Sequence, residues 1–592
     1  MGLLQELQRR KVVRTTAAYL VAAFVAAQVT QLLVDALDLP SWILKVVVVL
    51  EIVAIPLVVG LAWAFDISRA GVHVTDANAD ERAPFPWRRL TAPAAVSLVL
   101  LVAAGFYIVR AVMTPTTIST LAVLPFENTG GDTADDYFSD GMRDELAVAL
   151  ARLPALRIAG RTSSYMFKDR AAPAEEIGRA LDVNALIAGT VRRAGGRLRV
   201  TAQLVGTRDG KVMWDSVFES SSSDVFGVQD EFTRAIVAAL WPTLSGGGGD
   251  DVTIDTKRGT MDTEAYELYL KGRYHWLERG EANLHRAIDY YRQAIARDPR
   301  FARAHAGLSL AYGVLPSYVP RREEWRVAQE ASARRAVALD STLTDGRLAL
   351  GLLDDQDLKL ADAEAEYRAA LALEPGNASV HHALGFTLFA MGRTEEGLDH
   401  LQRATRIDPL AKSAGTAYAA ALTFARRFDE AVAEARRILA IDSTFQLGLL
   451  VLGFAHAFDG KPDSAVLTLE QARARYPDAR SSDALLVFAY AASGRYADAR
   501  RLRDELHART NPPDMANAAF ADLVLGDPEP LVQLLTTVGG QREWYQTSLG
   551  FGCNPMLDPL WSDARFRNAM RELGTEPCAL AKPWPAALQR TQ

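Results

Sequence analysis

Few residues of this chain occur in the spacings that catalysis requires. The glycine run 246–249 is not followed by the Lys-Ser or Lys-Thr pair of a phosphate-binding loop, so it is typical of a flexible linker. The serines at 163–164 and 220–223 lack a motif such as GxSxG, and a serine without a positioned base is not activated as a nucleophile. These segments give no support for phosphate transfer or covalent catalysis.

The histidines and the paired carboxylates also fail to form a recognisable site. The nine histidines show no HExxH pattern, and the adjacent His381 and His382 would point to different faces of a helix. The acidic pairs 135–136 and 175–176 fall at predicted helix starts, where carboxylates complement the helix dipole. We therefore predict no enzyme activity, no cofactor and no metal site.

Aromatic side chains at repeated positions are better candidates for function. In an array of helical pairs, the first helix of each pair lines the concave face, which would be unusually aromatic here. The predicted partner-binding residues are His382, Phe386, Phe389, Phe424, Phe454, Phe458 and Phe488. Such a groove suits an extended or helical segment of a protein or peptide partner. Alternatively, these phenylalanines belong to the core, or the carboxy-terminal tail covers them.

A repeated pattern of small residues indicates the scaffold that would position these side chains. The order small, small, aromatic or leucine, alanine, proline begins at Gly351, Gly385 and Gly453, so successive starts are 34 and 68 residues apart. Small residues let two antiparallel helices approach, the larger side chain fills their seam, and the proline ends the second helix. The period resembles that of tetratricopeptide repeats (TPRs), and we expect about seven helical pairs from Glu264 to Thr510.

Between residues 117 and 243 the pattern changes to a mixed order of strands and helices. Strands are expected at 121–126, 156–159 and 211–219, and helices at 137–153, 173–181 and 225–240. Residues 185–191 and 197–205 alternate around the turn Ala194-Gly-Gly196, which predicts a hairpin. A small α/β domain of two or three layers follows from this order.

Three apolar runs precede this domain, at residues 15–34, 42–65 and 90–112. Each is near the roughly 20 residues that cross a bilayer. Buried core helices are the alternative, but the clustering favours membrane spans. Basic residues precede the first and third runs and are missing from 35–41, which places the amino terminus in the cytoplasm and residues after Met113 outside it.

Two further features depend on this topology. Glu51 lies within the second run, where an ionisable side chain is costly; the structural alternative is a protonated or hydrogen-bonded Glu51 that faces Gln28 or Gln31. Cys553 and Cys578 fall in the part expected outside the cytoplasm, where a disulfide could persist, and two free thiols are the alternative.

Two strings of the mixed segment carry a family resemblance. LAVLPFENTGGDTADDYFSDGMRDELAVALARLPALRIAGRTSSYMFK and VNALIAGTVRRAGGRLRVTAQLVGTRDGKVMWD resemble the amino-terminal domain of TolB and the related flagellar outer-membrane protein family. The later strings EAYELYLKGRYHW and AIDYYRQAIARDPRFARAHAGLSLAY resemble the TPR array that follows this domain in many bacterial membrane proteins. QELQRRKVVRTTAAYLVAAFVAAQVTQ resembles the membrane leader of the same architecture. The resemblance implies a periplasmic interaction module attached to the bacterial inner membrane.

The expected fold class is multi-domain, with three transmembrane helices, a small α/β domain and an all-α TPR solenoid. The expected boundaries are 1–113 for the membrane anchor, 117–243 for the TolB-like α/β domain, 244–263 for a Gly-rich linker, 264–510 for the repeats and 511–592 for a helical carboxy-terminal cap.

We expect a membrane-anchored periplasmic scaffold that binds protein partners. The alternative is a transmembrane sensor or regulator that relays periplasmic binding to a cytoplasmic partner. Some proteins of this architecture carry a DNA-binding or nucleotide cyclase domain before the membrane, whereas only about 14 residues precede the first run here. The formal net charge of -7 gives no basic footprint for nucleic acid, and no pattern assigns an oligomeric state.

Overall fold

The computed structural model describes residues 12–36, isolated positions between 47 and 58, residues 65–68 and 71–74, and most of 118–584. Gaps in the last range fall at 133–134, 154–155, 169, 222–224, 245–258, 320–321, 477–481, 510–511, 538–552 and 576–583. The chain forms two compact units, Met1–Thr117 and Ile118–Gln592.

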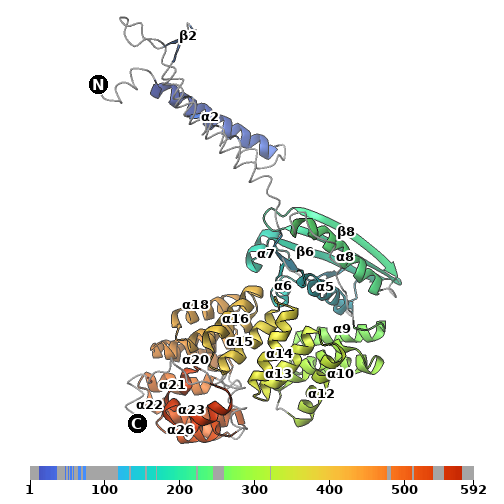
Figure 1. The fold of residues 1–592 in the computed structure, drawn as a ribbon. Helices are drawn as coiled ribbons and strands as arrows, with labels where there is room; N and C mark the ends of the chain where they lie inside the picture. The colour runs from blue at the N-terminus through green and yellow to red at the C-terminus, as the bar shows by residue number, and fades with distance from the viewer. Residues whose placement is uncertain are drawn as a thin grey trace, which may run out of the picture. The chain divides into compact units, whose positions relative to one another are not determined.

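The first unit contains one long helix and a short hairpin (Figure 1). Helix α2 spans Val12–Ala36, and strands β1 (Phe65–Ser68) and β2 (Gly71–Val74) pair antiparallel. The Tyr19 hydroxyl donates a hydrogen bond of 2.7 Å to the backbone carbonyl of Glu51. This contact places the backbone of Glu51 beside α2, and the functional role expected for its carboxylate stays a prediction.

The predicted membrane spans are not found. Among the residues that the structure describes, no helix is long and apolar enough to cross a bilayer. The finding contradicts the fold class with three transmembrane helices, and it gives no support for integral membrane attachment. In α2, Gln28, Thr30 and Gln31 limit the uninterrupted apolar stretch to residues 17–27, about half of the roughly 20 residues that a span needs. Most of the run 42–65 and all of 90–112 lie outside the described residues.

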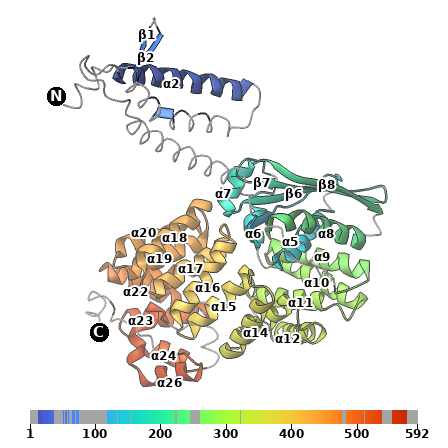
Figure 2. The ribbon, with the colours of Figure 1, turned by 45° about the horizontal axis from the view of Figure 1, so that its top comes forward.

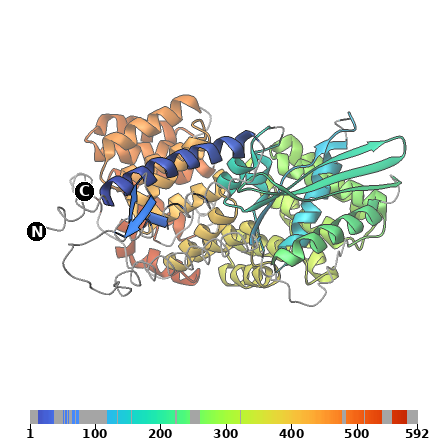
Figure 3. The same ribbon diagram turned by 90° about the horizontal axis from the view of Figure 1, so that it is seen from above.

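The second unit begins with a mixed sheet whose strand order is β5-β3-β6-β7-β8, with β4 (Glu127–Asn128) beside β6. β3 (Thr120–Val123) runs parallel to β5 (Arg157–Ile158) and to β6 (Ala185–Ala194). β6, β7 (Arg197–Gly206) and β8 (Val212–Ser221) form the long antiparallel meander seen from above in Figure 3. Gly195 and Gly196 form the two-residue turn between β6 and β7 with φ of +59° and +76°, so the predicted hairpin is confirmed.

Helices cover both faces of this sheet. α5 (Asp136–Ala151) and α8 (Val225–Leu244) lie on one face (Figure 2), where Phe232 packs edge-to-face on Phe126 and Phe218 with ring centroids 5.6 and 5.4 Å apart. α7 (Ala174–Leu181) packs on the other face, against Ala122 and Leu186. Successive residues of a strand point to opposite faces, so β3 supplies both cores.

The repeat array contains seven helical pairs between Thr263 and His507 in the described chain, which confirms the predicted number. The pairs are α9 (Thr263–Glu278) with α10 (Glu281–Arg297), α11 (Ala302–Val314) with α12 (Glu323–Leu339), α13 (Thr344–Gln356) with α14 (Leu360–Leu373), α15 (Ala378–Ala390) with α16 (Thr394–Ile407), α17 (Lys412–Phe424) with α18 (Phe428–Ile441), α19 (Gln446–Phe458) with α20 (Pro462–Arg475), and α21 (Asp483–Ala492) with α22 (Tyr496–His507).

The seam of each pair packs as the repeat pattern predicts. A Cβ atom on Gly351 would lie 2.5 Å from the ring of Tyr367, and one on Gly385 would lie 2.7 Å from Leu401. Both distances are too short for real Cβ contacts, so only glycine allows the two helices to approach this closely at these positions. Tyr367 and Leu401 are fully or nearly fully buried.

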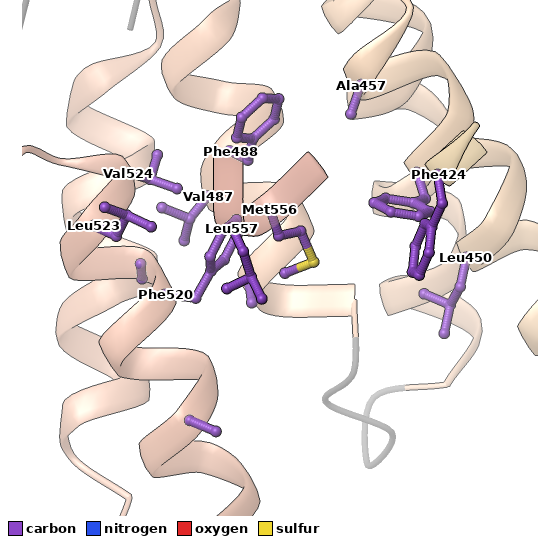
Figure 4. Close-up of a cluster of buried hydrophobic side chains, with 14 of the residues drawn as sticks. Phe424, Leu450, Ala457, Val487, Phe488, Phe520, Leu523, Val524, Met556 and Leu557 are labelled. Atoms are coloured by element: carbon purple, nitrogen blue, oxygen red, sulfur yellow. The ribbon is translucent and has the colours of Figure 1, made fainter. Parts of the chain in front are cut away.

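The chain after the repeats forms short helices that share the core of the array. α23 (Pro512–Val524) and α24 (Glu529–Leu535) are followed by a 3-10 helix, η4 (Pro555–Ser562), and by α26 (Ala564–Glu572). In Figure 4, Met556 and Leu557 of η4 lie between Phe488 and Phe520 on one side and Phe424 and Leu450 on the other. The described apolar residues of η4 and α26 therefore belong to the same hydrophobic core as the repeats.

Candidate partner-binding surface

Most of the predicted partner-binding phenylalanines are buried. Phe389, Phe424, Phe454 and Phe488 are at most 5% exposed, whereas His382, Phe386 and Phe458 are partly exposed. The cavity between Phe386, Phe389 and Phe424 measures about 10 Å³, which is room for one water molecule at most. This burial favours the alternative in which these residues are core or are covered by the carboxy-terminal tail.

Five of these residues form one continuous row of aromatic contacts. Ring centroids lie 5.9 Å apart for Phe389 and Phe424, 5.9 Å for Phe424 and Phe454, and 5.2 Å for Phe454 and Phe458. Phe458 then stacks on Phe488 at 4.4 Å. The row connects the first helices of four successive pairs, α15, α17, α19 and α21, and we call it the aromatic row. His382 and Phe386 pack on each other instead, at 5.8 Å.

The aromatic row continues into a residue that the repeat pattern did not identify. Trp584 packs edge-to-face on Phe488 at 5.2 Å and also contacts Phe520 at 6.0 Å. Its indole Nε1 donates a hydrogen bond of 3.0 Å to the carbonyl of Pro555. Trp584 lies far beyond the last repeat, so no period of small residues could have pointed to it.

Polar contacts hold the same terminal residues against the ends of the first helices. The Arg426 guanidinium, just after α17, donates to both carboxylate oxygens of Asp558 at 2.7 Å and to the carbonyl of Cys553 at 3.0 Å. Both side chains of this ion pair are nearly buried, and burial lowers the pKa of Arg426. Thr575 donates to the carbonyl of Ala390, at the end of α15. Residues 553–575 and Trp584 are called the carboxy-terminal segment below.

The carboxy-terminal segment contains the first of the two cysteines. Cys553 is part of a disulfide and is 4% exposed. Cys578, the other cysteine of the sequence, lies outside the described residues. The pairing of these two residues stays a prediction.

Histidines beside the aromatic row are neutral at physiological pH. Burial lowers the pKa of His382 to about 4, and burial together with His381 lowers the pKa of His400 to about 4. His381 and His400 share a hydrogen bond of 2.8 Å between their Nδ1 atoms, and Nε2 of His381 lies 2.9 Å from the carbonyl of Pro375. If Nε2 of His381 is the donor to this carbonyl, His400 donates to the ring of His381. His382 and His400 therefore present polar but uncharged rings on α15 and α16.

One curated relative bears on catalysis. A protein of Rhizobium meliloti (strain 1021) with the name "Putative adenylate cyclase 3" is 32% identical over 229 residues, which are 38% of this chain and 38% of that protein. The chain therefore matches about two fifths of the relative's length. This similarity contradicts the prediction that the chain is not an enzyme. The prediction depended on missing motifs, and an activity can use residues that no short motif records.

Other comparisons concern the repeats. The solved structure of YrrB, described as a TPR protein with an unusual peptide-binding site, is 18% identical and covers 34% of this chain and 97% of its own, with a TM-score of 0.27. PilF of Pseudomonas aeruginosa is 19% identical and covers 37% of this chain and 94% of its own, with a TM-score of 0.30. The tetratricopeptide repeat family model matches residues 356–422. The helical pairs within residues 356–422 are thus tetratricopeptide repeats.

Proposed function

We propose that this chain is a scaffold that binds a protein or peptide partner along the aromatic row, where its own carboxy-terminal segment lies in the structure. Tetratricopeptide repeats support a role in protein–protein interaction. The observation that carries the proposal is the contact between Phe488 and Trp584. In this contact a repeat residue packs against a segment outside the array.

The contacts of the carboxy-terminal segment indicate what a partner must offer. Trp584 provides an aromatic side chain at one end of the aromatic row, and Asp558 provides a carboxylate to Arg426. A partner that replaced the segment without a carboxylate would leave the Arg426 guanidinium buried and unpaired, which is strongly unfavourable. The best partner is therefore a segment with an acidic residue and a large aromatic residue.

The carboxy-terminal segment also limits partner binding. A tethered segment competes at an effective concentration on the order of millimolar, so a partner of moderate affinity gains access only after the segment is released. The disulfide at Cys553 adds a further restraint on release. Partner binding should thus respond to changes in the segment as well as to changes in the repeats.

Site-specific photo-crosslinking tests the proposal. A photoreactive amino acid at position 458, in the aromatic row and partly exposed, should crosslink to a partner protein in cells. The matched control is position 467 on α20, where the native leucine is 71% exposed and outside the row. Crosslinks from 467 that equal those from 458 would show that binding does not use the aromatic row.

We also propose that residues after about 113 work in an oxidising compartment such as the periplasm. The disulfide at Cys553 supports this location, because such bonds persist mainly outside the reducing cytoplasm. A reporter that is active only in the periplasm, fused after Met113, should be active. A silent reporter in cells that produce the intact fusion would contradict the proposal.

A second candidate function is cyclic-nucleotide signalling, favoured by the relative named as an adenylate cyclase. Either this chain converts ATP itself, or it regulates a protein that does. Purified full-length chain incubated with ATP and Mg²⁺ or Mn²⁺ should then release cyclic AMP and pyrophosphate in equal amounts if the activity is its own. If neither metal supports product formation, this chain does not convert ATP itself. Regulation of a separate cyclase is then the form of this function that remains.

A further inference from the structure

A cavity of about 1250 Å³ lies between the α/β domain and the first half of the repeat array. Residues of α5 and of α6 (Arg161–Tyr165) form one side, and residues of α9, α11, α13 and α15 form the other. Ion pairs hold the two sides together: Asp144 of α5 pairs with Arg273 of α9 at 3.1 Å, and Glu145 binds both terminal nitrogens of Arg303. These ion pairs therefore fix the two walls of the cavity relative to each other.

Three side-chain nitrogen atoms of residues that line this cavity are buried and have no hydrogen-bond partner among the described residues. They are Nη2 of Arg143, Nε1 of Trp276 and Nη1 of Arg279. All three are obligatory donors, and buried donors are normally satisfied. Arg143 is only 2% exposed, and its other nitrogens donate to the carbonyl of Val123 and to Asp144. The three lining residues thus carry N–H groups that lack acceptor oxygens.

Arg279 is a partly buried arginine of the cavity that forms no ion pair within the described part of the chain. By contrast, Asp144 pairs with Arg161 and Arg273, and Glu145 pairs with Arg303. Its guanidinium instead lies over the ring of Trp276, with Cζ 4.1 Å from the ring centroid. Burial and the nearby Arg161 lower its pKa, yet an arginine stays charged in proteins. A partly buried cation without a counterion favours the binding of an anion.

We propose that this cavity binds a small organic molecule that carries an oxyanion, a phosphate or a carboxylate, with the anion held by Arg279 and by the indole N–H of Trp276. The planar guanidinium suits either anion through two parallel hydrogen bonds. The volume exceeds that of a typical small-molecule pocket, so the ligand is larger than a bare ion. Arg143 Nη2 is available to a further polar oxygen of the same ligand. This site is separate from the aromatic row.

Thermal unfolding of the full-length chain with three probes tests the site. Inorganic phosphate, AMP and succinate are compared with sodium chloride at equal ionic strength. We expect at least one probe to raise the melting temperature with saturation. A response to AMP alone or to AMP and phosphate identifies a phosphate ligand, and a response to succinate alone identifies a carboxylate ligand.

Two variants and a matched control make the test specific. Trp276→Phe keeps the ring beneath Arg279 but removes the N–H, and should weaken probe binding roughly 10-fold. Arg279→Gln should abolish the response without lowering the melting temperature of the unliganded chain. The control is Arg322→Gln, since Arg322 also lies over a tryptophan, Trp325 at 5.0 Å, but is exposed and outside the cavity. No response to any probe, or a response that survives in both cavity variants, would overturn the proposal.

Discussion

The carboxylate of Asp408 accepts a hydrogen bond of 2.7 Å from the backbone N–H of Ser163, a residue 245 positions earlier in the chain. Asp408 follows α16 of the array and also accepts hydrogen bonds from the Ser163 hydroxyl and from the N–H of Thr162. It therefore caps the first turn of α6, which belongs to the α/β domain. The cap joins the two parts in addition to the ion pairs on α9.

Removal of this cap should destabilise the second unit. Asp408→Ala leaves buried N–H groups without an acceptor, so we expect the free energy of unfolding to fall by about 1 to 3 kcal/mol. Asp408→Asn keeps one acceptor oxygen and should cost less. Asp399→Ala is the control, because it breaks only an exposed ion pair with Arg403. If the two alanine variants lowered the free energy of unfolding equally in urea, the cap would contribute no more to stability than an exposed ion pair.

The ion pair between Arg426 and Asp558 should be important for stability as well as for retention of the carboxy-terminal segment. Arg426→Ala removes the guanidinium that pairs with the Asp558 carboxylate, whose side chain is 4% exposed, so we expect a loss of about 3 to 5 kcal/mol. Arg565→Ala breaks an exposed pair with Glu529 and should change the stability much less, because water screens exposed ion pairs. Denaturant unfolding measures the free energy of unfolding of both variants. A loss for Arg426→Ala as small as that for Arg565→Ala would contradict the prediction that this ion pair holds the carboxy-terminal segment.

Acid should destabilise the repeats through His382. Burial lowers the pKa of His382 to about 4 in the folded chain, below the usual value of about 6.5 in the unfolded chain. Between these pH values the unfolded state binds more protons, so stability falls as the pH drops from 6.5 to 4 and levels off below. Because His382 is partly exposed, we expect a contribution of about 1 to 2 kcal/mol. The variant His382→Gln should unfold with a flatter pH profile, and an unchanged slope would refute this cause.

The disulfide at Cys553 gives a prediction about thiol reactivity. If its partner is Cys578, labelling of unfolded, unreduced protein should be low and should rise to two thiols after reduction. The bond would close a loop of about 25 residues, and reduction should lower the free energy of unfolding by roughly 3 kcal/mol in the chain-entropy model. Labelling of two thiols before reduction would contradict the pairing.

Local patterns predicted the elements of this fold, whereas contacts between distant segments could not be predicted. The turn at Gly195 and Gly196 and the seam of Gly351 with Tyr367 depend on neighbouring residues or on a fixed period, so the sequence records them directly. The ion pair of Arg426 with Asp558 joins residues 132 positions apart, and nothing local marks either one.

The aromatic row illustrates the same limit within the candidate site. The repeat period correctly predicted that Phe389, Phe424, Phe454 and Phe488 lie on one side of the array. It could not show that Trp584 and η4 pack against that side, because their positions follow no repeat. The predicted fold class with three membrane spans was wrong for a related reason: in the first run, which the structure describes as α2, the average composition concealed the polar positions that shorten the apolar stretch.

Competition between the carboxy-terminal segment and an added peptide is the most direct test of the central claim, that the segment occupies a binding surface. A fluorescent, oxidised peptide of residues 553–584 is titrated into the full-length chain and into its Asp558→Ala, Trp584→Ala variant, and fluorescence anisotropy measures binding. We predict that the variant binds the peptide, that the unchanged chain does not, and that adding Arg426→Ala to the variant abolishes binding. Equal binding by the unchanged chain and the variant, or no binding by either, would contradict the proposed partner site.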